Sequence, residues 1–154
     1  MFEEWRIVPS KPGLMASSLG RIVLPKRRAQ MPHGGWRDYN PEPTFGVVRS
    51  AKKGAAHRYF GVFAMHYGNI KVHQAVCEAF HGPRPFPNAV VIHLNENGLD
   101  NSAGNLKWGT QKENLNAERF IQYRMARKPE RAGFVAAKIM QEDEFLKKLF
   151  GGAM

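Results

Sequence analysis

A chain of 154 residues with 43% hydrophobic residues is long enough for one ordinary domain, or for a small core with an appended module. It has no run of about 18 apolar residues to span a bilayer, and its acidic amino terminus differs from the basic, apolar start of a signal peptide, so we expect a cytoplasmic protein that has no membrane partner. The single cysteine, Cys77, excludes an intrachain disulfide and a zinc site built from four cysteines.

The chain is strongly basic, with a net charge of +10, and nucleic acid is the natural partner of so basic a small chain. The excess lies mainly in residues 1–70, which hold eleven Lys and Arg against four acids. Six of these cations form two clusters in turn-like or Gly- and Pro-containing settings, in which side chains can reach phosphates: Lys26, Arg27 and Arg28, and Lys52, Lys53 and Arg58. The alternative is that both clusters belong to solvated loops.

The first half of the chain predicts a small antiparallel sheet. Short apolar stretches at 4–9 and 14–24, broken by Pro and Gly, indicate brief strands joined by tight turns. Residues 29–56 have several prolines and glycines and little periodicity, which predicts a loop that encloses at most a short strand at 45–49. Aromatic and β-branched residues at 57–67 and 69–72, on either side of Gly68, predict a hairpin.

An amphipathic helix follows. Five apolar residues recur at i, i+3, i+4, i+7 and i+8, which places them on one helix face: Val72, Ala75, Val76, Ala79 and Phe80. Gly82 and the prolines after it end this helix.

The next segment predicts the order strand, loop, strand, helix. Residues 89–92 and 106–109 are short β-type runs, and the polar stretch 95–105 between them is rich in Asn and Gly. Thr110 stands three residues before Glu113, a capping-box spacing that predicts a helix from residue 111 to about 128, where Pro129 disfavours continuation. A last segment, 134–150, has apolar residues at helical spacing, and packing on the core, self-association and DNA contact all remain open for it.

Three side chains of this segment could together cleave a phosphodiester, which requires a base to deprotonate water and a divalent metal to neutralise the phosphate and the leaving oxygen. His93 ends the first strand and precedes the polar loop, an accessible place for a histidine base. Asn105 lies where the loop enters the second strand, and its amide can hold the loop backbone. Asn114 lies on the first turn of the next helix, from which an amide oxygen can face the strand pair.

Each of these residues has a simpler interpretation. An isolated histidine is more often a surface or core residue than a catalytic base. Loop asparagines tolerate left-handed backbone and bond their own chain, so Asn105 can be a loop former, and Asn114 can be a solvated helix residue. The spacing of the three across one strand, loop, strand and helix unit favours the joint interpretation.

The stretch KVHQAVCEAFHGPRPFPNAVVIHLNENGLDNSAGNLKWGTQKENLNA, residues 71–117, resembles the HNH homing endonuclease family of phages and mobile introns. Its motifs are a VHxxV helix start, an HLN turn, a DN pair, an NLKWGT strand and an EN helix. Upstream, EEWRIVPSKPGLMASSLGRI is similar to the small nuclease-associated module that precedes this domain in many homing enzymes.

The resemblance implies an α+β fold in which a small antiparallel β-sheet is followed by a ββα-metal (HNH) motif and C-terminal helices. It implies a β-rich DNA-binding module at 1–70, the nuclease domain at 71–128 and a helical segment at 129–154. His93 is then the general base, Asn105 the structural asparagine and Asn114 the ligand of a divalent metal, Mg²⁺ or Mn²⁺.

The implied substrate is double-stranded DNA. Lys112 and Arg119 become candidate phosphate contacts near the helix, as do Arg21 and Lys26 upstream, and the charge clusters add Arg27, Arg28 and Arg58. His73 and Trp108 match the family too and are interpreted as structural residues that pack or brace the motif. If the gene is carried by a phage, the expected location is the cytoplasm of the host cell.

One departure from the family matters. Nicking members have an acidic or amide ligand immediately before the catalytic histidine, and here that position is Ile92, which cannot bind a metal. Two functions therefore stay open: a metal-dependent endonuclease and a catalytically inactive DNA-binding protein of the same fold. The protein is expected to be a monomer or weak homodimer. As an endonuclease, a monomer with one site would nick one strand and a dimer could break both, and nicking is favoured because the chain has one complete constellation. An RNA-binding protein with basic loops is a third hypothesis, which no RNA-binding signature supports.

Overall fold

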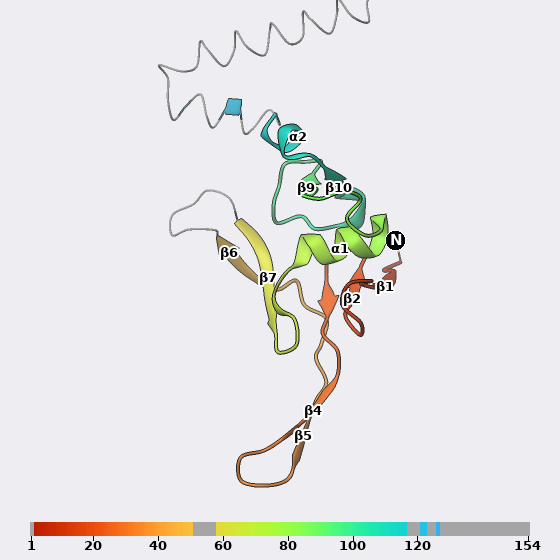
Figure 1. The fold of residues 1–154 in the computed structure, drawn as a ribbon, viewed down its shortest axis with the longest axis vertical. Coiled ribbons are helices and arrows are strands. Elements are labelled where there is room, and N and C mark those ends of the chain that lie inside the picture. Colours follow the sequence, from red (N-terminus) through yellow and green to blue (C-terminus); the bar gives the residue numbers. More distant parts are fainter. Residues whose placement is uncertain (1, 51–57, 117–120, 123–125, 127–154) are drawn as a thin grey trace, which may run out of the picture. The chain divides into compact units, whose positions relative to one another are not determined.

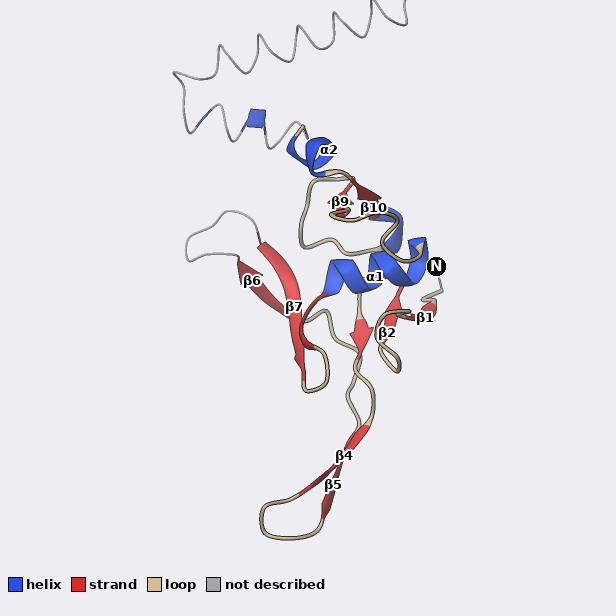
Figure 2. Cartoon of the chain, viewed as in Figure 1, coloured by secondary structure: helices blue, strands red, loops and turns tan. Residues whose placement is uncertain are grey.

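The structure is a computed structural model, and it describes residues 2–50, 58–116, 121, 122 and 126. The chain divides into two compact units, Met1–Asn114 and Leu115–Met154, and nearly all of the described residues belong to the first. Within the described residues, the fold combines small antiparallel sheets with few helices, which confirms the predicted α+β class (Figures 1 and 2).

The first sheet contains β1 (Trp5–Ile7), β2 (Met15–Ser17) and β3 (Ile22–Val23) in antiparallel order β1-β2-β3. These strands confirm the ones predicted within 4–9 and 14–24. Gly20 makes the turn between β2 and β3 with a φ of +85°, a backbone region that L side chains rarely adopt.

The prediction of a loop over 29–56 was wrong for its first part. A hairpin is present there, made of β4 (Arg27–Gln30) and β5 (Trp36–Tyr39), so Arg27 and Arg28 lie on a strand and not in a turn. Both strands are largely polar and solvent-exposed, so they lack the apolar alternation that predicts a strand. Gly34 and Gly35, at φ values of +87° and +84°, close the hairpin, and the Met31 amide donates to the Gly35 carbonyl.

The second three-stranded sheet has the order β6-β7-β8, with β6 (Val47–Ser50), β7 (Arg58–Ala64) and β8 (Gly68–Lys71). It confirms both the short strand expected near 45–49 and the hairpin around Gly68. The chain passes directly from β8 into α1 (Val72–His81), the predicted amphipathic helix, which Gly82 terminates at a φ of +84°.

The last elements are β9 (Val90–His93), the short 3₁₀ helix η1 (Ala103–Asn105), β10 (Leu106–Gly109) and α2 (Gln111–Leu115). The predicted capping box is present: the Thr110 amide donates to the Glu113 carboxylate at 2.6 Å, and the Glu113 amide donates to the Thr110 hydroxyl at 3.1 Å. The bonds that the Glu113 carboxylate accepts from the Thr110 amide and hydroxyl lower its pKa. Most of the predicted extension of this helix to about residue 128, and the whole segment 134–150, lie outside the described residues.

One hydrophobic core joins the amino-terminal sheet to the elements around β9 and β10. Helix α1 contacts β1, β2 and β3, the strands β7 and β8, and the β9–β10 pair with η1 (Figure 1). Fully buried core residues come from both sides of residue 70 and include Val8, Leu14, Ile22, Val76 and Leu106. The domain boundary after residue 70 stays a prediction, but residues on both sides of it share this core. Among the described helices, none is long and apolar enough to cross a membrane.

Cys77 offers a direct test of this core. It lies on α1, is fully buried, and its burial raises the pKa of the thiol to about 12. Because only the thiolate reacts, we expect Ellman's reagent to modify the native protein at least about a thousandfold more slowly at pH 8 than the protein unfolded in urea. The chain has one cysteine, so the released chromophore reports this site alone. Rapid reaction of the native protein would contradict the packing of α1.

Candidate active site

His93 stands at the end of β9, opposite Leu106 at the start of β10. The polar loop between the two strands is closed at its base, where the Leu94 amide donates to the Asn105 carbonyl at 2.8 Å. The strand, loop and strand order that the sequence predicted therefore places His93 beside a closed loop, at the exit from a paired strand.

Asn105 ties this loop together with its side chain. Its Oδ1 accepts a hydrogen bond from the Asn95 amide at 2.9 Å, and its Nδ2 donates to Asn95 Oδ1 at 2.9 Å and to the Asp100 carbonyl at 2.8 Å. Both polar atoms of the Asn105 amide are thus hydrogen-bonded, and they connect Asn95 at the start of the loop to Asp100 and to Asn105 at its end.

Other loop side chains bond the backbone two residues ahead. Asn95 Oδ1 accepts from the Asn97 amide, Asn97 Oδ1 from the Leu99 amide, and Asp100 Oδ1 from the Ser102 amide. Asp100 also accepts bonds from the Ser102 hydroxyl and from Asn95 Nδ2, both at 2.7 Å. The Ser102 bonds, the Asn95 bond and the charge of His93 lower the pKa of Asp100 against an opposing effect of burial.

The imidazole of His93 is held by Asn101. Its Nε2 lies 3.0 Å from Asn101 Oδ1, and Asn101 is buried with 3% of its surface exposed. An amide oxygen only accepts, so with this amide orientation Nε2 carries the hydrogen. In the neutral ring, Nδ1 is then the nitrogen with the lone pair, which is what a general base needs.

The turn of the amino-terminal sheet packs against the backbone of Asn101. A Cβ at Gly20 would lie 2.8 Å from the Asn101 carbonyl carbon and 2.9 Å from its oxygen, so only glycine allows this approach. Two residues further, the Ala103 amide donates to the Ser18 carbonyl at 2.9 Å, and the Ala103 carbonyl lies 2.8 Å from His81 Nε2 of α1. The β2–β3 turn and α1 therefore both hold the loop.

His73, on the first turn of α1, lies beside His93. Its buried ring is 5.5 Å from the His93 ring in an edge arrangement and 6.0 Å from the Tyr59 ring. Trp108 donates its indole N–H to the Gly82 carbonyl at 2.9 Å and so braces the end of α1. From the sequence, Asn101 was noted only in the DN pair at residues 100 and 101, and its contact with His93 was not predicted.

Ile92 lies on the opposite face of the β9–β10 pair from His93, because side chains alternate along a strand. A Cβ at Gly109 would lie 2.4 Å from Ile92 Cδ1 and 2.9 Å from Glu113 Oε2, so the buried Ile92 side chain fills the space between β10 and the start of α2. Asn114 is half-buried on α2, and its amide continues the helix by donating to the Thr110 carbonyl.

The sequence model of the HNH endonuclease family matches residues 70–116. These residues form an HNH domain. The match confirms the resemblance over 71–117, and it covers β9, β10, α2 and the whole loop that holds His93.

One solved structure, described as "DNA binding and cleavage by the HNH homing endonuclease I-HmuI", is similar to the chain with 22% sequence identity and a TM-score of 0.46. The similarity covers 87% of this chain and 66% of that chain, just under two thirds of its length. No curated protein matches the sequence.

The donors of this HNH domain fit a divalent metal only when the substrate supplies further oxygens. No group of three or more His, Cys, Asp or Glu that could hold a metal occurs among the described residues. Ile92 supplies no donor atom, and Glu113 is engaged by Thr110. The amide oxygen of Asn114 remains, and Mg²⁺ commonly combines few protein ligands with water and substrate phosphates.

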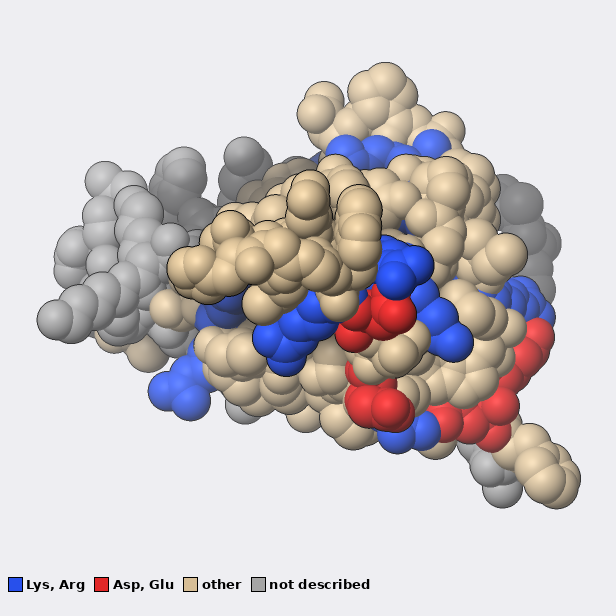
Figure 3. All heavy atoms as spheres, turned by 90° about the horizontal axis from the view of Figure 1, so that it is seen from below, with Lys and Arg blue, Asp and Glu red and all other residues tan. Residues whose placement is uncertain are grey.

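The candidate DNA contacts lie in different settings. Arg21 pairs with Glu3 through two hydrogen bonds, so its charge is compensated. Arg27 stacks 3.9 Å over the Tyr39 ring, and Arg28 pairs with Asp38 at 3.4 Å. The side on which the β4–β5 hairpin lies in Figure 1 shows Lys and Arg atoms interspersed with acidic ones (Figure 3).

Three further candidates, Lys26, Arg58 and Lys112, are solvent-exposed. Arg119, Lys52 and Lys53 lie outside the described residues.

Gly20→Ala tests whether the amino-terminal turn positions His93. The variant forces an L residue to a φ of +85° and drives its Cβ into the Asn101 backbone, so we expect a stability loss of roughly 1–3 kcal/mol or more and a loss of any His93-dependent activity. Gly34→Ala is the matched control, since φ is +87° there and nothing lies within 4 Å of the added Cβ. Urea unfolding and DNA nicking measure both effects. Equal behaviour of the two variants would show that the Gly20–Asn101 contact has no role beyond backbone strain.

Proposed function

We propose that this protein is a metal-dependent endonuclease that hydrolyses phosphodiester bonds in double-stranded DNA and nicks one strand. The observation that carries the proposal is the His93–Asn101 hydrogen bond of 3.0 Å, which fixes the imidazole with Nδ1 as the basic nitrogen. The family match over residues 70–116 supports a nuclease domain around this base.

In the proposed reaction, His93 Nδ1 removes a proton from a water molecule whose oxygen attacks the phosphorus atom. The P–O3′ bond breaks, the 3′ oxygen takes a proton from solvent, and the products carry a 5′ phosphate and a 3′ hydroxyl. Protonation gives His93 a positive charge, which strengthens its Nε2–H bond to Asn101 Oδ1. The nearby Asp100 carboxylate favours that charge as well.

A divalent cation, Mg²⁺ or Mn²⁺, would supply positive charge at the phosphate and the leaving oxygen when bound. Asn114 is the residue of this chain that would hold it, together with oxygens of the DNA. Asn105 takes no part in proton transfer and keeps the loop closed, so that His93 and Asn101 stay in register.

The DNA contacts proposed for the amino-terminal part lie largely on the β4–β5 hairpin. The register places Arg27, Ala29, Arg37 and Tyr39 on one face, where both arginines stack on the tyrosine and no acid is present. The other face pairs Arg28 with Asp38. A two-stranded ribbon fits the major groove of B-DNA, so we propose that the Arg27 face approaches the DNA, with Lys26, Arg58, Lys112 and Arg119 as further phosphate contacts.

One histidine base makes one cut, so a monomer with its single site nicks one strand, whereas a weak homodimer with two sites could break both. We propose nicking, because one chain carries one such constellation. We assign the protein to the phage or mobile-element type, where a DNA-nicking enzyme would act in the cytoplasm of the host cell. The second candidate is an inactive DNA-binding protein with the same fold, which the apolar residue at Ile92 favours.

The test is a nicking assay on supercoiled plasmid with Mg²⁺ or Mn²⁺, with EDTA as the metal-free control. We expect metal-dependent conversion to the open circular form by the wild type and a loss of at least about a hundredfold in His93→Ala, because general-base catalysis contributes about 10²–10⁴-fold. His33→Ala is the matched control, since His33 is an exposed histidine in the β4–β5 turn.

The outcomes separate the candidate functions. Equal nicking by His93→Ala and wild type would exclude His93 as the base. A wild type that shifts duplex DNA on a gel without cutting it in either metal would select the inactive DNA-binding protein. Preference for RNA over duplex DNA in a competition assay would contradict the proposed substrate.

Ile92→Asp tests whether a carboxylate immediately before His93 strengthens metal binding. A carboxylate at this position, beside α2, adds a charged oxygen donor, so we expect half-maximal nicking at a lower Mg²⁺ concentration, by roughly tenfold for one added interaction of about 1.4 kcal/mol. Ile92→Ala is the control, because it removes the same apolar contacts without adding a donor and should not lower the Mg²⁺ requirement. Thermal unfolding of both variants measures the cost of disturbing the buried side chain. An unchanged or higher Mg²⁺ requirement in a folded Ile92→Asp protein would place the metal away from Ile92.

A further inference from the structure

The outer face of the sheet β6-β7-β8 carries two cations, together with the exposed apolar side chains of Val47 and Phe63. The strand register puts Arg49 beside Tyr59 and Lys71 beside Gly61, and all four residues share this face. The alternate residues of the strands, which include Phe60, Val62 and Ile70, lie on the other face and pack against the hydrophobic core.

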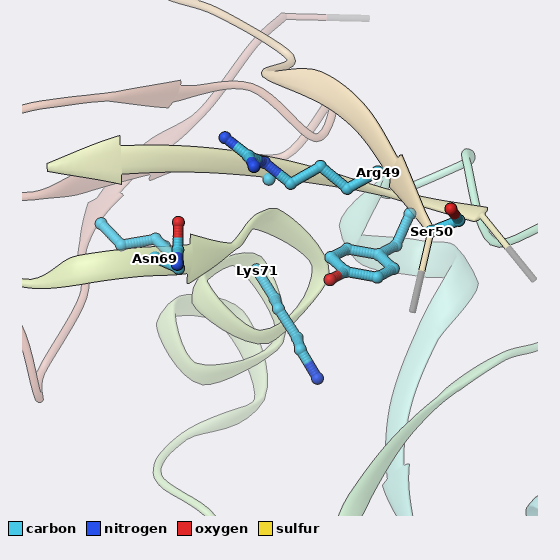
Figure 4. A pocket seen from close by; sticks show the side chains of 7 residues that line it. Arg49, Ser50, Asn69 and Lys71 are labelled. Carbon is cyan, nitrogen blue, oxygen red and sulfur yellow. The ribbon is translucent and has the colours of Figure 1, made fainter. Parts of the chain in front are cut away.

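A cavity of about 370 Å³ opens on the outer face, and we name it the outer pocket. Arg49, Tyr59, Gly61, Asn69 and Lys71 are among the residues that line it. Figure 4 shows the Arg49 side chain extending over the strands and Lys71 extending from the end of β8. None of the lining residues is acidic, so the two cations give the pocket a charge of about +2.

Gly61 shapes the floor of the outer pocket. A Cβ at this position would lie 2.8 Å from Arg49 Cδ and 3.1 Å from Arg49 Nε. The missing side chain thus lets Arg49 lie across the central strand. Within the described part of the chain, no carboxylate pairs with Arg49, whereas Lys71 Nζ lies 5.5 Å from the centroid of the Tyr59 ring.

The outer pocket is connected to the base by ring contacts. Tyr59, which lines the pocket, lies 6.0 Å from His73, and His73 lies 5.5 Å from His93. A DNA strand carries one phosphate per about 3.4 Å of helix axis. The Tyr59–His73 and His73–His93 ring distances together therefore correspond to only a few phosphates along a strand. The pocket is therefore within reach of the same DNA strand as the base.

We propose that the outer pocket binds the phosphate backbone of the DNA substrate, with one phosphate at Arg49 and one at Lys71, a few nucleotides from the bond that is cut. The inference rests on the proposed function, since it gives that DNA a second point of attachment. A guanidinium offers two parallel N–H donors to a phosphate, and an ammonium offers a compact charge, which matches Arg49 and Lys71. Asn69 adds an amide donor at the rim. The phosphates held there fix the position of the strand over His93.

The test measures binding of a fluorescent DNA duplex by anisotropy in EDTA, over a range of salt concentrations, for the full chain. Arg49→Gln and Lys71→Gln each remove one charge from the outer pocket. Lys11→Gln is the matched control, because Lys11 is a cation in the β1–β2 turn that donates to Ser10. Gly61→Ala keeps the net charge and displaces Arg49.

We expect Arg49→Gln and Lys71→Gln each to weaken binding roughly eightfold at about 0.1 M salt, and to lower the slope of log K against log salt by about 0.9, the value for one lost phosphate contact. Gly61→Ala should weaken binding without a change in net charge, and adding Arg49→Gln to it should cost little more, because both changes remove the same contact. Thermal unfolding checks that each variant is folded.

The proposal that the outer pocket binds phosphate would be overturned if Arg49→Gln and Lys71→Gln had the same affinities and salt slopes as Lys11→Gln. If the wild type still nicks plasmid in that case, the proposed function survives. If the wild type binds DNA through the pocket and never nicks, the pocket survives and the proposed catalysis fails. A wild type that does not bind duplex DNA would overturn both.

Discussion

The orientation of His93 depends on a loop that is too polar to be held by apolar burial. Three side chains between β9 and β10, those of Asn95, Asn97 and Asp100, each accept a hydrogen bond from the backbone amide two residues ahead. A single bond of this kind contributes only about 1 kcal/mol net, so the loop owes its shape to the network and to Asn105, which links both of its ends. The hydrogen bond that the imidazole donates to Asn101 Oδ1 is one more member of this network.

The network is in turn anchored by elements far away in the sequence. Ala103 is held on one side by the Ser18 carbonyl and on the other by His81, and Gly20 packs directly on the Asn101 backbone. The amino-terminal sheet therefore supports the loop that holds His93. This explains why its core residues pack in one cluster with those of α1 and β10.

Local patterns were enough to predict the parts of the fold that local physics determines. The periodicity from Val72 to Phe80 predicted α1, and the Thr110 to Glu113 spacing predicted the capping box that starts α2. The β4–β5 hairpin has polar residues on both faces and gave no such pattern. The contact between His93 and Asn101 spans eight residues and depends on the path of the loop, so only the structure shows it.

The two faces of the β9–β10 pair separate His93, the proposed base, from the position of the expected metal ligand. His93 faces α1 and the His73 ring, whereas Ile92 faces Gly109 and the start of α2. An apolar side chain at Ile92 therefore leaves the hydrogen bonds of His93 intact and adds packing where a ligand would otherwise stand. In the proposed enzyme, the metal must then take most of its oxygens from the DNA, so metal and DNA strengthen each other's binding by the same factor. Contacts that hold the phosphate backbone, including those of the outer pocket, thereby contribute to metal binding as well as to DNA affinity.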